Sequence, residues 1–234
     1  MTFAMYDRMA EICLEINEDR SIKALILTGA GDKAFASGTD ISQFRAFKTA
    51  QDALDYEARI DRVLGTPRAM PRARDRGDQR RLQFGGGAGA LPPMPRSAQA
   101  APRRRIGFRI ARTLGNCLSM SNISRVVALV GPARTKDMIF KRPPRRGPEA
   151  RHGLLNEVVP DVETLQRRAD ETAKLVASHA PLTLEATKEA VRRICRTLSR
   201  EEGEDLILKA YMSEDFREGM DAFLNKRAPV WKGR

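Results

Sequence analysis

The stretch Ala34–Gln43 (AFASGTDISQ) contains the residues of this chain that are best suited to chemistry. It joins a short apolar run, Ile22–Leu27, to a segment with helical spacing that begins near Asp40. The small residues Ala36–Gly38 allow a ligand to approach the backbone closely. Backbone amides that precede and open a helix favour negative charge. The pattern therefore predicts a site that stabilises an oxyanion through backbone N–H groups, without a charged side chain.

Other reactive side chains are poorly placed for a metal site or for nucleophilic catalysis. Cys13, Cys117 and Cys195 lie far apart in the sequence, form no CxxC pair and have no histidine at ligand spacing. His152 and His179 have no serine or cysteine placed to form a nucleophilic pair. We therefore expect no metal site, no disulfide framework, and free thiols in a reducing compartment.

Length and composition are those of a globular protein. With 234 residues and 41% hydrophobic side chains, the chain can bury one good core or two modest ones. The N-terminus lacks the basic start and compact apolar block of a secretion signal, and no apolar run reaches the length of a membrane span. We therefore expect a cytoplasmic protein that has no membrane partner.

The formal net charge of +12 is confined to two segments. Residues 66–105 contain ten arginines and two acids, which gives +8, and residues 141–152 contain five basic residues and one acid, which gives +4. The remainder of the chain is therefore neutral. A strongly basic protein can bind nucleic acid or an anionic membrane, but here the charge belongs to two segments and not to the fold.

The rest of the sequence alternates helical and strand-like segments, which is an α/β pattern. Apolar residues at steps of three and four predict helices, and short β-branched runs predict buried strands. Thr2 is the expected N-cap of the first helix. The predicted helices are 3–18, 40–65, 116–130, 132–140, 161–178, 181–198, 201–212 and 214–224, and the predicted strands are 22–27 and 153–159.

The two basic segments interrupt this pattern. Residues 66–105 contain no Ile, Val, Trp or Tyr and include six prolines, which break helices and central strands. A structureless segment of this length is unusual inside a compact domain. Two interpretations are open: a genuine basic insertion, or translation of a GC-rich gene in a shifted reading frame, which resequencing of the coding DNA would reveal.

Several stretches resemble the crotonase family, which is the enoyl-CoA hydratase/isomerase family. Residues 22–44 (IKALILTGAGDKAFASGTDISQF) are similar to its signature of strand, Gly-rich turn and helix. GLLNEVVP at 153–160 is similar to the link into its C-terminal helices, and residues 214–233 are similar to its terminal helix and ending. Together with residues 116–140, the resemblance covers most of the chain in the order of the family.

The resemblance implies an α/β fold with a crotonase-like ββα superhelical core over residues 1–159 and a C-terminal helical layer over residues 160–234. It also implies a homotrimer or a hexamer assembled through the C-terminal helices. Residues 66–105 and 141–152 are atypical of this core. The family begins with a β-hairpin that this sequence lacks, so an N-terminally truncated member with an exposed sheet edge is expected.

An acyl-CoA thioester is the substrate that the resemblance implies, with coenzyme A as part of the substrate and no separate cofactor. In the family two backbone N–H groups hold the thioester carbonyl, and such a donor contributes about 3 kcal/mol. The motif assigns the first donor to Thr39 and the coenzyme contacts to Ala36, Thr39, Asp40 and Ile41. The second donor is implied at Gly86, in the GGG triplet; a chance triplet in Gly/Ala-rich text is the alternative.

The glutamate pair that hydratases of the family use as general base and acid is absent from the matching positions. One position corresponds to Gly89, and the other falls within Ile106–Ala111 (IGFRIA), which contains no acid. No Asp or Glu occurs between Asp78 and Asp137. Glu157 is the carboxylate in GLLNEVVP, and it is expected to have a structural role.

These observations predict an acyl-CoA-binding protein with enoyl-CoA hydratase or isomerase chemistry, as in fatty acid metabolism, through oxyanion-hole stabilisation of a thioester enolate. Because the glutamate pair is absent, a non-catalytic family member is an alternative. A protein that binds RNA or another polyanion through the Arg-rich segments is another, since the family includes a member that binds AU-rich RNA. Those segments lack interleaved aromatic residues apart from Phe84, which disfavours nucleic acid.

Overall fold

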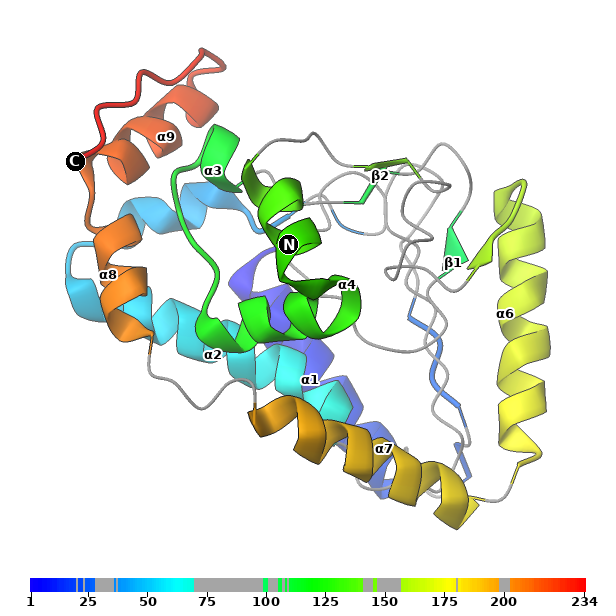
Figure 1. The fold of residues 1–234 in the computed structure, drawn as a ribbon. Helices are drawn as coiled ribbons and strands as arrows, with labels where there is room; N and C mark the ends of the chain where they lie inside the picture. The colour runs from blue at the N-terminus through cyan, green and yellow to red at the C-terminus, as the bar shows by residue number, and fades with distance from the viewer. Residues whose placement is uncertain are drawn as a thin grey trace.

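A computed structural model describes residues 1–19, 21–22, 24–27, 36, 38–69, 99–100, 105–106, 108, 110–140, 145–146, 157–179, 181–197 and 203–234. This part of the chain is mostly helical (Figure 1). Its helices are α1 (Phe3–Glu18), the 3-10 helix η1 (Ile41–Ala46), α2 (Ala50–Ala69), α3 (Ile110–Thr113), α4 (Met120–Phe140), α6 (Val162–Ala177), α7 (Pro181–Thr197), α8 (Glu204–Tyr211) and α9 (Glu214–Leu224).

The strands within the described residues are short. They are β1 (Gln99–Ala100), β2 (Arg105–Ile106), β3 (Arg145–Arg146) and β4 (Glu157–Val158). β1 pairs with β4 in parallel, with Gln99 opposite Glu157, and β2 pairs with β3 in the antiparallel sense, with Arg105 opposite Arg146. The parallel pair brings residues near the end of the first basic segment beside the start of the C-terminal helices.

Helix α1 is confirmed at both of its predicted ends. Thr2 is its N-cap, and the Thr2 Oγ1 atom accepts a hydrogen bond from the Met5 amide at 3.3 Å. Tyr6 and Cys13 are its buried residues, and the helix packs along α2 (Figure 1). The apolar face read from the sequence therefore serves to dock α1 on α2.

Two clusters of buried side chains form the core, and α2 contributes to both. The first cluster joins α1, α2 and α4 and consists of Tyr6, Ile60, Val63, Leu64, Phe108, Val126 and Met138. The second joins η1, α2, α8 and α9 and consists of Phe44, Ala53, Leu114, Ile207, Tyr211 and Phe216. The C-terminal helices α8 and α9 thus pack on the same helix that holds α1.

Phe44 of η1 lies inside a group of aromatic rings. Its ring centroid is 4.9 Å from that of Tyr56, 5.1 Å from Phe47, 5.9 Å from Phe216 and 6.3 Å from Tyr211. The pairs with Tyr56 and Tyr211 are edge-to-face, and such pairs contribute about 1 kcal/mol beyond their buried area. The group fixes the position of η1, and with it the turn that contains Thr39.

Three predicted elements are wrong in type or extent. The single helix predicted over 40–65 is divided into η1 and α2. The described residues of the predicted strand 22–27 form no strand. Leu25 packs against Cys13, and Leu27 packs against the first cluster, so the apolar pattern reflects burial without a β-ladder. The predicted helix at Asn116 begins at Met120 instead, because Ser119 Oγ accepts the Asn122 amide at 3.2 Å.

The C-terminal helices agree with the sequence pattern to within a few residues. Asp161 caps α6 by accepting the Thr164 amide at 2.6 Å, and Ser213 caps α9 by accepting the Phe216 amide at 2.9 Å. In α4, Gly131 has φ 78° and ψ 163°, so it interrupts the helix where the sequence predicts a stop.

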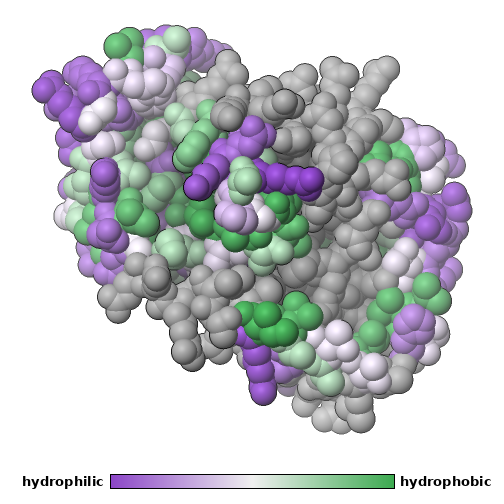
Figure 2. All heavy atoms as spheres, viewed as in Figure 1, coloured by the Kyte–Doolittle hydropathy of each residue, from purple (hydrophilic) through white to green (hydrophobic). Residues whose placement is uncertain are grey.

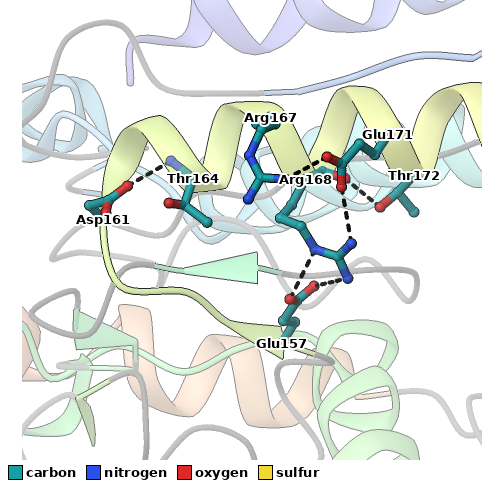
Figure 3. A network of polar contacts seen from close by, with 7 residues as sticks. All are labelled: Glu157, Asp161, Thr164, Arg167, Arg168, Glu171 and Thr172. Carbon is teal, nitrogen blue, oxygen red and sulfur yellow. Dashed lines mark hydrogen bonds and ion pairs between the residues drawn. The ribbon is translucent and has the colours of Figure 1, made fainter.

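Glu157 joins β4 to α6 through the ion-pair network in Figure 3. The Arg168 Nε and Nη2 atoms donate to the two Glu157 carboxylate oxygens at 3.1 and 3.3 Å. Arg168 Nη1 also donates to Glu171 at 3.0 Å, and Arg167 Nη1 donates to the same carboxylate at 2.5 Å. Glu157 is thus engaged in the structural contact that its position in the sequence suggests.

Gly219 of α9 permits a close approach to Leu114. A Cβ atom at residue 219 would lie 2.4 Å from the Leu114 carbonyl oxygen. We expect Gly219→Ala to lower the free energy of unfolding by roughly 1–3 kcal/mol, despite the better helix propensity of alanine. Gly65→Ala in α2 is the matched control, because nothing lies within 4 Å of its Cβ position. Urea titration measures both variants, and equal effects would contradict the proposed clash.

Candidate functional site

The residues predicted from the motif lie in the turn that leads into η1. Ala36 is buried, Thr39 is half-buried, Asp40 is exposed, and Ile41 is the first residue of η1. Gly86 lies outside the described residues, as does Gly89. The pairing of Thr39 with a second amide donor therefore stays a prediction.

Gly38 gives this turn its shape. Its φ of 113° is in the left-handed region that side chains with a Cβ atom rarely adopt. The Met1 amino group donates to the Gly38 carbonyl oxygen at 2.5 Å. The glycine in the motif is therefore required by the backbone immediately before Thr39.

Most amides around Thr39 already have acceptors. The Asp40 amide donates to the Met1 carbonyl at 2.8 Å, the Ser42 amide to Asp40 Oδ1 at 3.0 Å, and the Gln43 amide to the Asp40 carbonyl at 3.2 Å. Within the described part of the chain, the Thr39 amide has no hydrogen-bond acceptor. The Asp40, Ser42 and Gln43 amides at the start of η1 are thus used internally, which leaves the amides of Thr39 and Ile41.

The Asp40 carboxylate also serves the turn. It accepts the Ser42 hydroxyl at 2.7 Å as well as the Ser42 amide. These hydrogen bonds, with the one from the hydroxyl the stronger, hold the pKa of the Asp40 carboxyl below its usual value. Asp40 is therefore the ionised N-cap of η1 and not a proton donor at neutral pH.

The Thr39 side chain is held by two tyrosines. Thr39 Oγ1 lies 2.9 Å from Tyr6 Oη of α1 and 3.1 Å from Tyr56 Oη of α2, in hydrogen bonds. Burial raises the pKa of Tyr6 to about 12 and also raises the pKa of Tyr56. Both phenols are therefore neutral at physiological pH and can donate a proton in a hydrogen bond.

Sequence reasoning missed Glu57, a buried carboxyl on α2 that is only 4% exposed. Tyr211 Oη of α8 donates to Glu57 Oε1 at 2.6 Å, and the Ser119 amide donates to Glu57 Oε2 at 3.2 Å. Asn116 Nδ2 donates in turn to Tyr211 Oη at 3.2 Å. The signal that predicts this burial is the spacing Ala53, Glu57, Ile60 and Leu64, which puts Glu57 on the apolar face of α2.

Burial dominates the electrostatics of Glu57. It raises the pKa of the Glu57 carboxyl to about 7, against the lowering effect of the Tyr211 hydroxyl, while nearby Asp61 adds to the increase. Burial likewise raises the pKa of Asp61, which accepts the Ser119 hydroxyl at 3.1 Å and lies 3.8 Å from Arg125. Glu57 can thus change its protonation state near neutral pH, although both of its oxygens are bound inside the protein.

The described residues show neither a metal cluster nor a reactive thiol. No group of three or more His, Cys, Asp or Glu side chains among them could hold a metal ion. Cys13 and Cys117 are in no disulfide within the described residues, and burial raises the pKa of the Cys117 thiol to about 12, so it is not a thiolate. No helix in the described part of the chain is long and apolar enough to cross a membrane.

Comparison with known proteins adds a family and a fold to this geometry. A family model described as Enoyl-CoA hydratase/isomerase matches residues 106–234, and a second model with the same description matches residues 1–63. Carnitinyl-CoA dehydratase from Salmonella typhi is 31% identical over 245 residues, which cover 97% of this chain and 87% of that protein. Short-chain-enoyl-CoA hydratase from Clostridium acetobutylicum is 29% identical over 231 residues, which cover 91% and 81%.

Solved structures agree over nearly the whole chain. An enoyl-CoA hydratase/carnithine racemase from Magnetospirillum magneticum has a TM-score of 0.74 and 26% identity, over 100% of this chain and 87% of that one. Methylmalonyl-CoA decarboxylase complexed with 2S-carboxypropyl CoA has a TM-score of 0.83 over 98% and 88% of the two chains. Its identity is 24%, so this second likeness concerns the fold alone.

Proposed function

Because the chain belongs to the enoyl-CoA hydratase/isomerase family and has its crotonase fold, we propose that it binds an acyl-CoA thioester and stabilises the enolate oxygen through the Thr39 amide. The chemistry is of the hydratase or isomerase type. It proceeds without the usual glutamate pair, whose matching positions, Gly89 and Ile106–Ala111, contain no acid.

The observation that supports this proposal is the state of the Thr39 amide. It follows Gly38 in the motif, and within the described residues it has no hydrogen-bond acceptor, a state that it shares with the Ile41 amide, whereas the Asp40, Ser42 and Gln43 amides are all taken. A preorganised N–H donor aimed at a developing oxyanion contributes about 3 kcal/mol to the transition state. Gly86 is proposed as the second donor, and backbone groups of Ala36, Asp40 and Ile41 are proposed to flank the coenzyme.

The choice of thioester class follows from the relatives. The names carnitinyl-CoA dehydratase and short-chain-enoyl-CoA hydratase both describe removal or addition of water on a CoA thioester. A short 2-enoyl-CoA and its 3-hydroxyacyl counterpart are therefore the first substrates to test. Because a thioester carbonyl polarised by one amide still needs a proton donor and acceptor for hydration, we expect slow turnover beside firm binding.

The C-terminal helices are proposed to carry the contacts of a homotrimer or hexamer. Leu175 of α6 is 57% exposed, and Val191 and Ile194 of α7 are 40% and 68% exposed. Figure 2 shows hydrophobic residues at the surface in the region of α6 and α7. Burial of such side chains between subunits is favourable at about 25 cal/mol per Å².

Binding to butyryl-CoA is the direct test of the proposed function. We expect the purified full chain to bind butyryl-CoA in calorimetry, and to bind ADP at the same concentration much more weakly. The ADP arm is needed because a net charge of +12 attracts any polyphosphate. Equal binding of both ligands that falls steeply with added salt would refute thioester recognition and favour a general polyanion-binding protein.

A further inference from the structure

The Thr39 hydroxyl is hydrogen bonded to tyrosine hydroxyls from two different helices. Tyr6 Oη of α1 and Tyr56 Oη of α2 both lie within hydrogen-bonding distance of Thr39 Oγ1, at 2.9 and 3.1 Å. A threonine hydroxyl has one proton and two lone pairs, so it can serve both phenols at once. Because buried hydroxyls need a partner, loss of the Thr39 hydroxyl would leave two tyrosines unsatisfied.

The peptide groups on either side of Thr39 are held by a different residue. Met1 donates its amino group to the Gly38 carbonyl at 2.5 Å and accepts the Asp40 amide at 2.8 Å. Four polar contacts therefore fix the backbone and side chain of this turn, and none of them uses the Thr39 N–H. Within the described part of the chain, this arrangement orients the Thr39 N–H while leaving it without an acceptor.

The two tyrosines are themselves held firmly. Tyr6 is fully buried in the first cluster, between α1, α2 and α4. The Tyr56 ring packs edge-to-face on Phe44 at 4.9 Å and lies 5.6 Å from the Phe3 ring. Side chains locked by packing can hold a hydrogen-bonded partner to within the tolerance that a catalytic donor requires.

We propose that Tyr6 and Tyr56 are positioning residues that act through the Thr39 side chain to aim the Thr39 amide at the thioester oxygen. The inference rests on the proposed function, because it assumes that the Thr39 amide binds the thioester oxygen. It goes beyond the oxyanion assignment by naming the side chains that set the direction of the donor. It also gives the hydroxyl of residue 39 a role that the backbone donor alone does not require.

The first test uses the protein without ligand. The Asp40 amide reports opening of the turn, because it is hydrogen bonded to Met1, and its hydrogen exchange is measured by NMR. We expect Tyr6→Phe and Tyr56→Phe each to speed Asp40 exchange about tenfold, the effect of losing one buried hydrogen bond. Tyr211→Phe is the matched control, since Tyr211 bonds to Glu57 and not to Thr39, and it should leave this rate unchanged.

The second test uses cinnamoyl-CoA as a probe of carbonyl polarisation. The thioester carbonyl stretch should fall in frequency when the wild type binds the probe, and it should fall less in Tyr56→Phe and Thr39→Val. Thr39→Ser should restore the wild-type shift because it keeps the hydroxyl. With crotonyl-CoA, we expect Tyr56→Phe to lower kcat about fivefold to tenfold while KM changes less than twofold, as befits loss of a transition-state contact.

The outcomes separate the inference from the function on which it rests. A wild-type complex that shows no carbonyl shift would refute the proposed function, and the inference with it. A wild-type shift that persists unchanged in Tyr6→Phe, Tyr56→Phe and Thr39→Val would refute the positioning role alone. An unaltered rate of Asp40 amide exchange in both tyrosine variants would also refute the positioning role, independently of the measurements with thioesters.

Discussion

Thr39→Pro is expected to lower turnover of crotonyl-CoA by about 10²–10³-fold, because proline lacks the N–H group that we assign to the oxyanion. Thr39→Val is the matched comparison. It keeps the amide and loses the hydroxyl, so its loss should be only about fivefold to tenfold. The difference between the two variants isolates the contribution of the backbone donor. It is measured as kcat at saturating substrate and as kcat/KM at limiting substrate.

Stability must be measured beside activity for this pair. Gly38 precedes residue 39 and has φ 113°, and a following proline restricts the residue before it. Thermal unfolding shows whether Thr39→Pro still folds. A folded Thr39→Pro variant that retains the activity of Thr39→Val would remove Thr39 from the oxyanion site.

Glu57→Gln is expected to make the protein more stable than the wild type at pH 8, although it alters a buried hydrogen-bonded group. The pKa of Glu57 is about 7 in the folded protein and 4.5 as the reference value. Between these values the folded state holds a proton that the unfolded state has lost, so the free energy of unfolding falls as pH rises. Above pH 7 the buried carboxylate lowers the free energy of unfolding by roughly 3 kcal/mol.

Glutamine cannot ionise, so the variant should lose this pH dependence between pH 4.5 and 7. At pH 4 both proteins are neutral at residue 57. There the variant should be equal to the wild type or about 1 kcal/mol less stable, since an amide offers one acceptor where the carboxyl has two oxygens bound to Tyr211 and Ser119. Urea titrations at pH 4, 6 and 8 give the profile.

The pH dependence of stability of the Tyr211→Phe variant provides a second test. The Tyr211 hydroxyl lowers the pKa of Glu57, so its removal should raise that pKa further and extend the fall of stability to higher pH. A wild-type protein whose stability rises from pH 5 to pH 7 would contradict the buried, protonated state of Glu57. Parallel profiles for the wild type and Glu57→Gln would assign the pH dependence to other groups.

Local sequence signals predicted the parts of the fold that depend on neighbouring residues. Thr2 caps α1 as predicted, and Gly131 interrupts α4 between the two helices predicted there, because capping and helix breaking are decided within one turn. The family and its crotonase fold follow from the motif at residues 34–43 in the same way. Gly38 and Thr39 are read directly from that motif.

The predictions that the structure contradicts concern features that depend on contacts between residues distant in the sequence. The described residues of an apolar run such as Ile22–Leu27 can be partly buried in either conformation, and only a neighbouring strand would make the run β. The helix expected at Asn116 starts later because residues 115–119 reach the α2 carboxyl and α8. Glu57 was not predicted because its partner Tyr211 is 154 residues away in the sequence, and because Glu57 does not lie at either position of the family's glutamate pair.

The contact between α2 and α8 has a consequence for how the chain folds. During synthesis, Glu57 is made long before Tyr211, and until α8 docks the carboxyl has neither that phenol nor a dry environment. The carboxyl is then ionised at neutral pH, and its hydration opposes early collapse of that face of α2. Because closure of so long a loop is entropically costly and slow, we expect α8 to dock late, in a step that is coupled to proton uptake by Glu57 and is faster at mildly acidic pH.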